Sequence, residues 1–295
     1  MGEIAALLTS VFWAFSSIIH TFAGRRVGPG VLNRARLLFA VIWILLTHWI
    51  LQGTPFPFHA TPERWFWLGL SGVVGLVLGD WFLFYSYVTI GARMGTLIMA
   101  SVPMLSAVLA WIFLGETLTP TEIFGMVLVV AGISMVILDR TNGNTHLPRR
   151  AYWLGVLAGF GGALGQAGNL ILAKPGLAGD FPSISGVAIR MVTAAVVLWG
   201  LTFFKKEGRP TLEALKDRRA LGLILLGSMI GPFAGVWLSM IAIQNTLVGI
   251  ASTLMALSPV ILLPLSRWFF HENISWRAIA GTFICMAGTA ALFLL

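Results

Sequence analysis

The residue with the clearest capacity for chemistry is Asp80, which stands in the apolar and aromatic stretch GLVLGDWFLFYSY at 75–87. A charge near the centre of a bilayer costs at least about 2.5–3.5 kcal/mol, so its side chain must face protein or water and have a partner. Such a carboxylate can hold a proton, an amine or a neighbouring cation. Asp80 is therefore the first candidate for a substrate-binding residue.

Arg36 is the predicted partner of Asp80, because both residues fall in the same half of the membrane on consecutive spans. Two interpretations stay open: a fixed ion pair that holds the spans together, and a role in substrate or proton binding. An internal repeat places Val236 at the position equivalent to Asp80. A purely architectural acid would be expected in both copies, which favours the specialised role.

A polar stripe near the N-terminus supplies further candidates. Trp13, Ser16, Ser17 and His20 recur at the spacing of one helix face. We expect this stripe to face protein, and a histidine in it would suit proton coupling, because the ordinary pKa of the imidazole lies near neutral pH. The alternative is that the serines bond back to their own helix and His20 reaches the interface.

The second half of the chain carries three polar candidates. Gln166 and Asn169 lie three residues apart among glycines, where amides either join closely packed helices or bind a ligand. Arg190 is the counterpart of Arg36 at a slightly different offset from the rest of the internal repeat, and it either binds a carboxylate or phosphate group or extends to lipid headgroups. Tyr85, Met99 and Trp237 complete the candidate substrate-binding set as apolar walls, although packing alone also accounts for such residues.

Membrane helices must position these residues. The chain has 295 residues, of which 58% are hydrophobic and 10% charged, with a mean hydropathy of +0.90. A soluble domain carries about 25% charged residues, and a helical span takes about 20 apolar residues. The sequence predicts an all-α polytopic membrane protein with ten transmembrane helices, at 3–23, 31–51, 65–89, 94–114, 121–138, 153–173, 184–204, 219–242, 247–270 and 277–294.

Composition also limits partners and cofactors. The single cysteine, Cys285, excludes an intramolecular disulfide and a cysteine metal site. His271-Glu272 lacks a second ligand four residues on, so we expect neither a metal nor a cofactor. The net charge of +8 resides in loops and fits anionic lipid headgroups rather than nucleic acid. Whether the chain forms a homodimer is left open.

An offset of 156 residues carries Pro103 onto Pro259, Glu116 onto Glu272 and the glycine pair of GLVLG at 75–79 onto that of GPFAG at 231–235. The sequence thus predicts two five-helix copies, 1–138 and 153–295, joined by a linker at 139–152. Since five is odd, the second copy enters from the opposite side, and inverted repeats place a site near the midplane. We expect the glycine pairs to make close contacts between the copies and the two prolines to kink their spans.

The repeated region resembles the drug/metabolite transporter superfamily, specifically its EamA-type members. The resemblance rests on FLFYSYVTIGAR followed by ASVPMLSAVLAWIFLGETLTPTEIFGMVLVVAGI, and on the second copy in register. It implies a secondary transporter that moves small polar metabolites, such as amino acids, outward across a bacterial or archaeal cytoplasmic membrane. It also implies cytoplasmic termini, whereas the basic loops favour termini outside.

Two alternatives remain beside an amino-acid exporter. One is a nucleotide-sugar or drug transporter of the same fold. The other is a membrane-embedded enzyme acting on lipid, although the sequence has no G-x-S-x-G elbow and no phosphate-binding P-loop.

Overall fold

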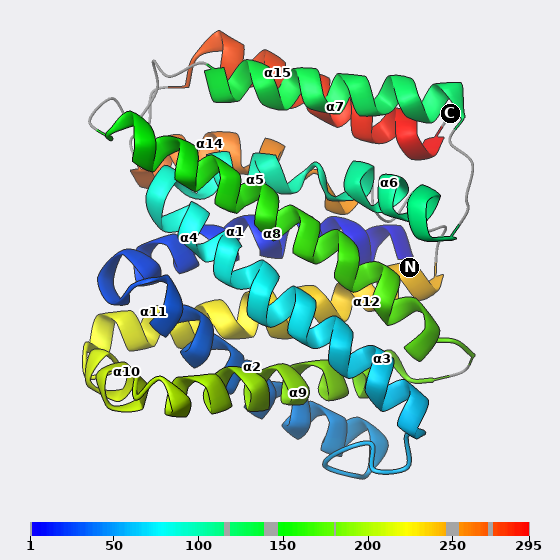
Figure 1. Cartoon of the computed structure of the whole chain (residues 1–295), viewed down its shortest axis with the longest axis vertical. Helices are drawn as coiled ribbons and strands as arrows, with labels where there is room; N and C mark the ends of the chain where they lie inside the picture. Colours follow the sequence, from blue (N-terminus) through cyan, green and yellow to red (C-terminus); the bar gives the residue numbers. More distant parts are fainter. Residues whose placement is uncertain are drawn as a thin grey trace.

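The computed structural model describes residues 2–114, 119–138, 147–179, 181–245, 254–270 and 274–294, and every regular element in these ranges is a helix (Figure 1). Within them, eight helices are long and apolar enough to cross a membrane: Gly2–Val27, Pro29–Gln52, Pro62–Ile90, Ala92–Leu109, Pro120–Leu138, Arg149–Ala173, Ser183–Phe204 and Arg218–Ala242. The predicted all-α polytopic fold is confirmed. The count of ten spans stays a prediction, and Glu116, His271 and Glu272 lie outside the described residues.

Six helices form single elements close to the predicted spans: α1 (Gly2–Val27), α2 (Pro29–Gln52), α7 (Pro120–Leu138), α8 (Arg149–Gly176), α9 (Ser183–Phe204) and α15 (Trp276–Leu294). The others are α3 (Pro62–Gly72), α4 (Asp80–Ile90), α5 (Ala92–Met99), α6 (Val102–Leu114), α10 (Gly208–Ala214), α11 (Arg218–Ser228), α12 (Val236–Asn245) and α14 (Ser258–Phe270). The N and C labels both lie on the right-hand side of Figure 1, and α10 lies on the left-hand side.

One π-helical segment interrupts the third long helix of each copy, and sequence reasoning missed both segments. They are η1 (Val73–Gly79), between α3 and α4, and η2 (Met229–Gly235), between α11 and α12. The offset of 156 residues carries one segment onto the other from end to end. Wider winding of this kind occurs mostly as short insertions in α-helices, often at functional sites.

A turn lies just before each of the two prolines that are expected to kink their spans. The chain turns at residues 100–101 between α5 and α6, and turns again at residues 256–257 before α14. Pro103 and Pro259 therefore each lie in the first turn of the following helix. This position suits proline because the amide that it lacks would have no intrahelical partner there.

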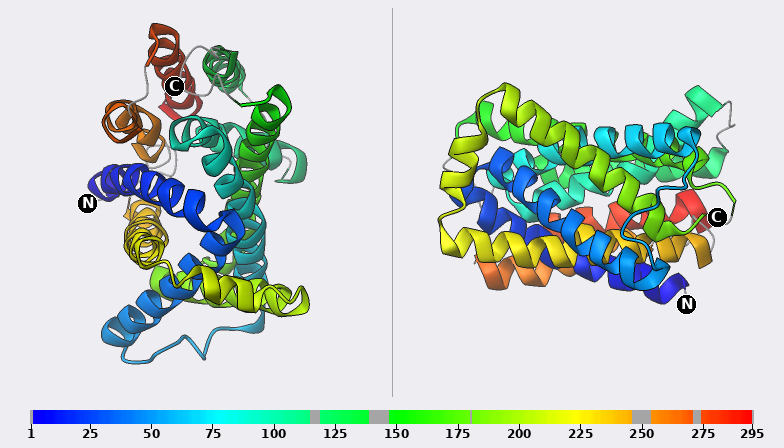
Figure 2. Two further views of the ribbon diagram at one scale, coloured as in Figure 1. Left: turned by 90° about the vertical axis from the view of Figure 1, so that its left-hand side faces the viewer. Right: turned by 90° about the horizontal axis from the view of Figure 1, so that it is seen from below.

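The first helix of each predicted copy packs on the third long helix of the other. α1 contacts α11, η2 and α12, while α8 contacts α3, η1 and α4. The end-on view shows α1 between α14 and the α11–α12 helix (Figure 2). Glycines permit this approach: a Cβ at Gly75 would lie 2.8 Å from Asn169, and one at Gly235 would lie 2.8 Å from Trp13. Both predicted glycine contacts are present.

Helices α7 and α15 cross at one end of the molecule, side by side in Figure 1. Cβ atoms added at Gly132 and Gly288 would lie 2.5 Å from the carbonyl oxygen of Gly281 and 2.6 Å from that of Gly125, respectively. Gly132 and Gly288 are repeat equivalents, as are Gly125 and Gly281. The two helices therefore run antiparallel, and their contact has the two-fold form that inverted copies require.

Candidate functional site

Asp80 is the first residue of α4, directly after η1, and only 5% of it is exposed. Its Oδ2 accepts a hydrogen bond from Arg36 Nη2 within a buried ion pair, and its Oδ1 accepts one from Gln166 Nε2 at 3.0 Å. The next residue, Trp81, is 45% exposed and faces outward instead. The carboxylate is therefore turned into the protein and paired, as its cost in lipid requires.

Asn33 of α2 holds the arginine in place. Arg36 donates from Nε and Nη2 to Asn33 Oδ1 at 3.3 and 3.1 Å, and its guanidinium lies 4.6 Å from the centre of the Phe84 ring. Asn33 Nδ2 in turn donates to the carbonyl oxygens of Leu76 and Val77 in η1, at 3.2 and 3.4 Å. The π-helical segment thus supplies acceptors that bind α2 next to Asp80.

Sequence reasoning did not select Asn33. The available signal was a second polar residue three positions before Arg36, on the same helix face of an otherwise apolar span.

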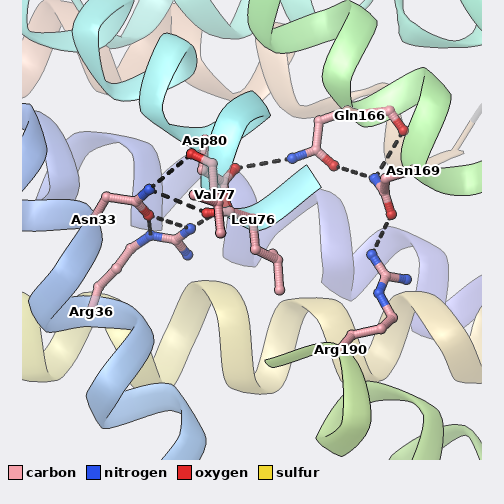
Figure 3. Close-up of polar contacts among 8 residues, drawn as sticks. All are labelled: Asn33, Arg36, Leu76, Val77, Asp80, Gln166, Asn169 and Arg190. Atoms are coloured by element: carbon pink, nitrogen blue, oxygen red, sulfur yellow. Dashed lines mark hydrogen bonds and ion pairs between the residues drawn. The ribbon is translucent and has the colours of Figure 1, made fainter. Parts of the chain in front are cut away.

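The amides of α8 extend the network towards α9 (Figure 3). Asn169 Nδ2 donates to the carbonyl oxygen of Gln166 at 2.9 Å and to its Oε1 at 2.8 Å. Asn169 Oδ1 accepts a hydrogen bond from Arg190 Nη2. A continuous polar chain therefore runs from Arg36 through Asp80, Gln166 and Asn169 to Arg190, and it joins α2, α4, α8 and α9.

His20 lies beside this polar chain. It is 3% exposed, its ring meets the Phe84 ring edge-on at 5.1 Å, and a Cβ at Gly227 would lie 2.7 Å from its Nε2. That nitrogen has no hydrogen-bond partner among the described residues. Phe84 thus contacts both His20 and Arg36, and the stripe on α1 faces protein.

The other three members of the α1 stripe have local contacts. The Ser16 hydroxyl donates to the carbonyl oxygen of Trp13 at 3.3 Å. The Ser17 hydroxyl donates to the carbonyl oxygen of Ala14 at 2.7 Å, so it bonds back to its own helix. Trp13 is half-buried and packs on Gly235.

The three apolar candidates contact aromatic or aliphatic neighbours. The half-buried Tyr85 ring stacks on Trp81 with 6.0 Å between centroids, which places Tyr85 beside an exposed ring. Trp237 lies against Phe233, and Met99 packs on the apolar cluster that contains Phe84. Of the predicted set, the structure brings Asp80, Arg36, Gln166, Asn169 and Arg190 into one network, with His20 next to it.

The network combines the groups that recognise small polar solutes. A buried carboxylate can take up a proton or bind an amine, and a buried guanidinium can bind a carboxylate or phosphate group through parallel hydrogen bonds. Long apolar helices around a buried ionisable network are typical of integral multi-pass membrane proteins, and in transporters such residues line the path of the solute or ion.

The chain belongs to the EamA-like transporter family, whose model matches residues 1–138 and 153–294. It is 27% identical over 223 residues to "Uncharacterized transporter YvbV" of Bacillus subtilis (strain 168), which covers 70% of this chain and 68% of that protein. It is 22% identical over 291 residues to "Uncharacterized transporter YwfM" of the same organism, covering 97% and 91% of the two chains. One crystal structure shares the fold with a TM-score of 0.66 at 16% identity, over 100% of this chain and 98% of the other.

The resemblance seen in the sequence is thereby confirmed at the level of the family. Transport across a membrane is the general function that the family and both relatives indicate.

Proposed function

We propose that this protein is a secondary active transporter that exports small polar metabolites, such as amino acids, by alternating access with proton coupling. In this proposal the protein spans the cytoplasmic membrane of a bacterium or archaeon. Residues 1–138 and 153–295 form two inverted units that move relative to each other around the polar chain.

The observation that carries the proposal is the connection of Asp80 to both predicted units. Its carboxylate binds Arg36 of the first unit and Gln166 of the second. A proton or a substrate amine that binds Asp80 weakens its ion pair with Arg36 and its hydrogen bond with Gln166 together. Occupation of one carboxylate is thereby coupled to the contact between α4 and α8, which opens in an alternating-access cycle.

His20 is the proposed second proton site. It is buried with its ring against Phe84, which Arg36 also contacts, and its Nε2 has no hydrogen-bond partner among the described residues. A cationic imidazole there repels the Arg36 guanidinium, which favours release of Arg36 from Asp80.

Two other functions compete with this proposal. A nucleotide-sugar or drug transporter would use the same fold with a different solute. A membrane enzyme acting on lipid would require a nucleophile or metal site, and the described residues contain no group of three or more His, Cys, Asp or Glu side chains able to hold a metal.

Proteoliposomes that contain a pH-sensitive dye test the proposal. Wild-type protein should produce proton flux that depends on an added amino-acid gradient, and Asp80→Asn should abolish the proton flux or uncouple it from the solute. The matched control is Asp217→Asn, which removes a carboxylate at the start of α11, away from the polar chain. Unchanged flux and unchanged coupling in Asp80→Asn would remove Asp80 from the mechanism.

A further inference from the structure

The two buried arginines of the polar chain have unequal partners. Arg36 is 3% exposed and paired with the Asp80 carboxylate. Arg190 is 5% exposed, and among the described residues its Nη2 donates to the neutral amide oxygen of Asn169, while the Asp80 carboxylate, already paired with Arg36, attracts it without a direct hydrogen bond. Its Nη1 is buried without a hydrogen-bond partner among the described residues. The chain from Arg36 to Arg190 therefore contains two cations and one anion.

The repeat shows where the second anion is missing. In the first copy, Arg36 on α2 meets the residue that follows η1, which is Asp80. In the second copy, α9 carries Arg190 and the residue that follows η2 is Val236. Val236 packs on the apolar cluster that includes Val187 and Met191, both on α9. The second copy thus keeps the arginine and the π-helical segment but lacks the carboxylate.

A buried guanidinium without a counter-charge is costly, because the low-dielectric interior does not replace the water that it has lost. An arginine cannot escape this cost by losing its proton. Retaining Arg190 where its acid is absent is favourable when an anion from outside the chain supplies the missing charge.

We propose that Arg190 binds an oxyanion of the transported solute, a carboxylate or a phosphate group, in place of the acid that the second copy lacks. The inference rests on the transport function proposed above and narrows it, since the solute must carry an anionic group. The opposite end of a zwitterionic solute faces Asp80, which lies beyond the two α8 amides. Arg190 is seven residues inside α9, about 10 Å from the start of the helix.

Thermal unfolding of the purified protein in uncharged detergent tests the anion site without requiring transport. The probes are L-glutamate, L-lactate and inorganic phosphate, with sodium chloride at equal ionic strength and choline chloride as references. At least one oxyanion should raise the unfolding temperature of the wild type. Arg190→Gln should weaken the apparent affinity at least about tenfold, as expected for loss of a hydrogen bond to a charged group, whereas the exposed Arg277→Gln should not.

Restoring the missing acid gives an independent test. Val236→Asp places a carboxylate at the position equivalent to Asp80, so it should pair with Arg190 and abolish stabilisation by oxyanions. Val236→Asn, which has the same shape without the charge, should leave that stabilisation in place. Combined with Arg190→Gln, Val236→Asp should lose more stability than the two single changes predict, because a buried Asp has then lost its partner.

The outcomes separate the inference from the transport proposal. Three results would overturn the anion site. They are a wild type that no oxyanion stabilises, an equal stabilisation of Arg190→Gln by the oxyanions, and additive effects of Val236→Asp and Arg190→Gln on stability. The proposal would also be overturned if anionic phosphatidylglycerol in nanodiscs stabilised the protein through Arg190 to the same degree as the free oxyanions. That result would identify the ligand as a lipid headgroup. Oxyanion binding through Arg190 without solute flux in proteoliposomes would overturn transport and leave the anion site intact.

Discussion

Breaking the ion pair between Asp80 and Arg36 should destabilise the protein strongly, and loss of the carboxylate should cost more than loss of the guanidinium. Asp80→Leu leaves the Arg36 guanidinium buried, and removing one partner of a buried pair costs about 3–5 kcal/mol. The Asn33 oxygen and the Phe84 ring still contact that guanidinium. We therefore expect the lower end, about 3 kcal/mol, or a fall in unfolding temperature of roughly 6 °C.

The reciprocal change should cost less. Arg36→Met leaves the Asp80 carboxylate without its cation, but a carboxylate can neutralise itself by taking up a proton, which a guanidinium cannot do by losing one. The double change Arg36→Met with Asp80→Leu removes both charges and should recover most of the stability, since apolar replacements of a buried pair are often neutral.

Cys285 provides the assay, because it is the single cysteine of the sequence and is fully buried in α15. A thiol-reactive fluorescent dye therefore reports unfolding as temperature or denaturant is raised, in the wild type and the three variants. The expected order of unfolding temperature is wild type and double variant, then Arg36→Met, then Asp80→Leu. Equal unfolding temperatures in all four proteins, or a double variant as unstable as the sum of the singles, would refute the argument that the pair is buried and coupled.

Three further outcomes follow from other contacts. Gly132→Ala should lower stability, since its Cβ would lie 2.4 Å from the Cys285 amide nitrogen. Its control, Gly200→Ala, has nothing within 4 Å of the added Cβ and should be neutral or stabilise the protein by about 0.5–1 kcal/mol. Dye-monitored unfolding compares the two variants. The hydrogen bond from Arg26 lowers the pKa of Asp217. Ionised Asp217 therefore stabilises the fold at pH values above the ordinary pKa of an aspartate, and this contribution is lost as the pH falls below about 4. Asp217→Asn should remove this pH dependence of the unfolding temperature, and an unchanged profile would contradict it. Thr119→Ala should cost about 1 kcal/mol by removing the hydroxyl that accepts from the first turn of α7, and Thr119→Ser should restore it.

The polar network was predictable to the extent that polarity is rare inside a membrane. A charge within an apolar span needs a partner, and this alone selected Asp80, Arg36 and Arg190 before any coordinates. The amides Gln166 and Asn169 stood out for the same reason. Asn33 was missed because its role depends on carbonyl acceptors in η1, which the sequence does not reveal.

The π-helical segments and the apolar side chains show where sequence reasoning ended. Winding of the π type in η1 and η2 leaves the apolar periodicity of a span too little changed to be recognised. Lipid-facing and protein-facing positions also have the same composition in a membrane helix. Tyr85, Trp237 and Met99 could therefore be selected as apolar walls, but their neighbours could not be predicted.

The crossing of α7 with α15 looks the same from either helix, and this bears on how such a chain arose. Each copy contributes two glycines to the contact, Gly125 and Gly132 from α7 and Gly281 and Gly288 from α15. A single five-helix polypeptide would therefore already carry both glycines that the contact needs. Such a polypeptide could bind an upside-down twin through this surface, as in a symmetric dimer. Fusion of two genes would then have preserved a helix–helix contact that existed before the copies were joined. Cutting the linker should leave two fragments that reassociate through this contact.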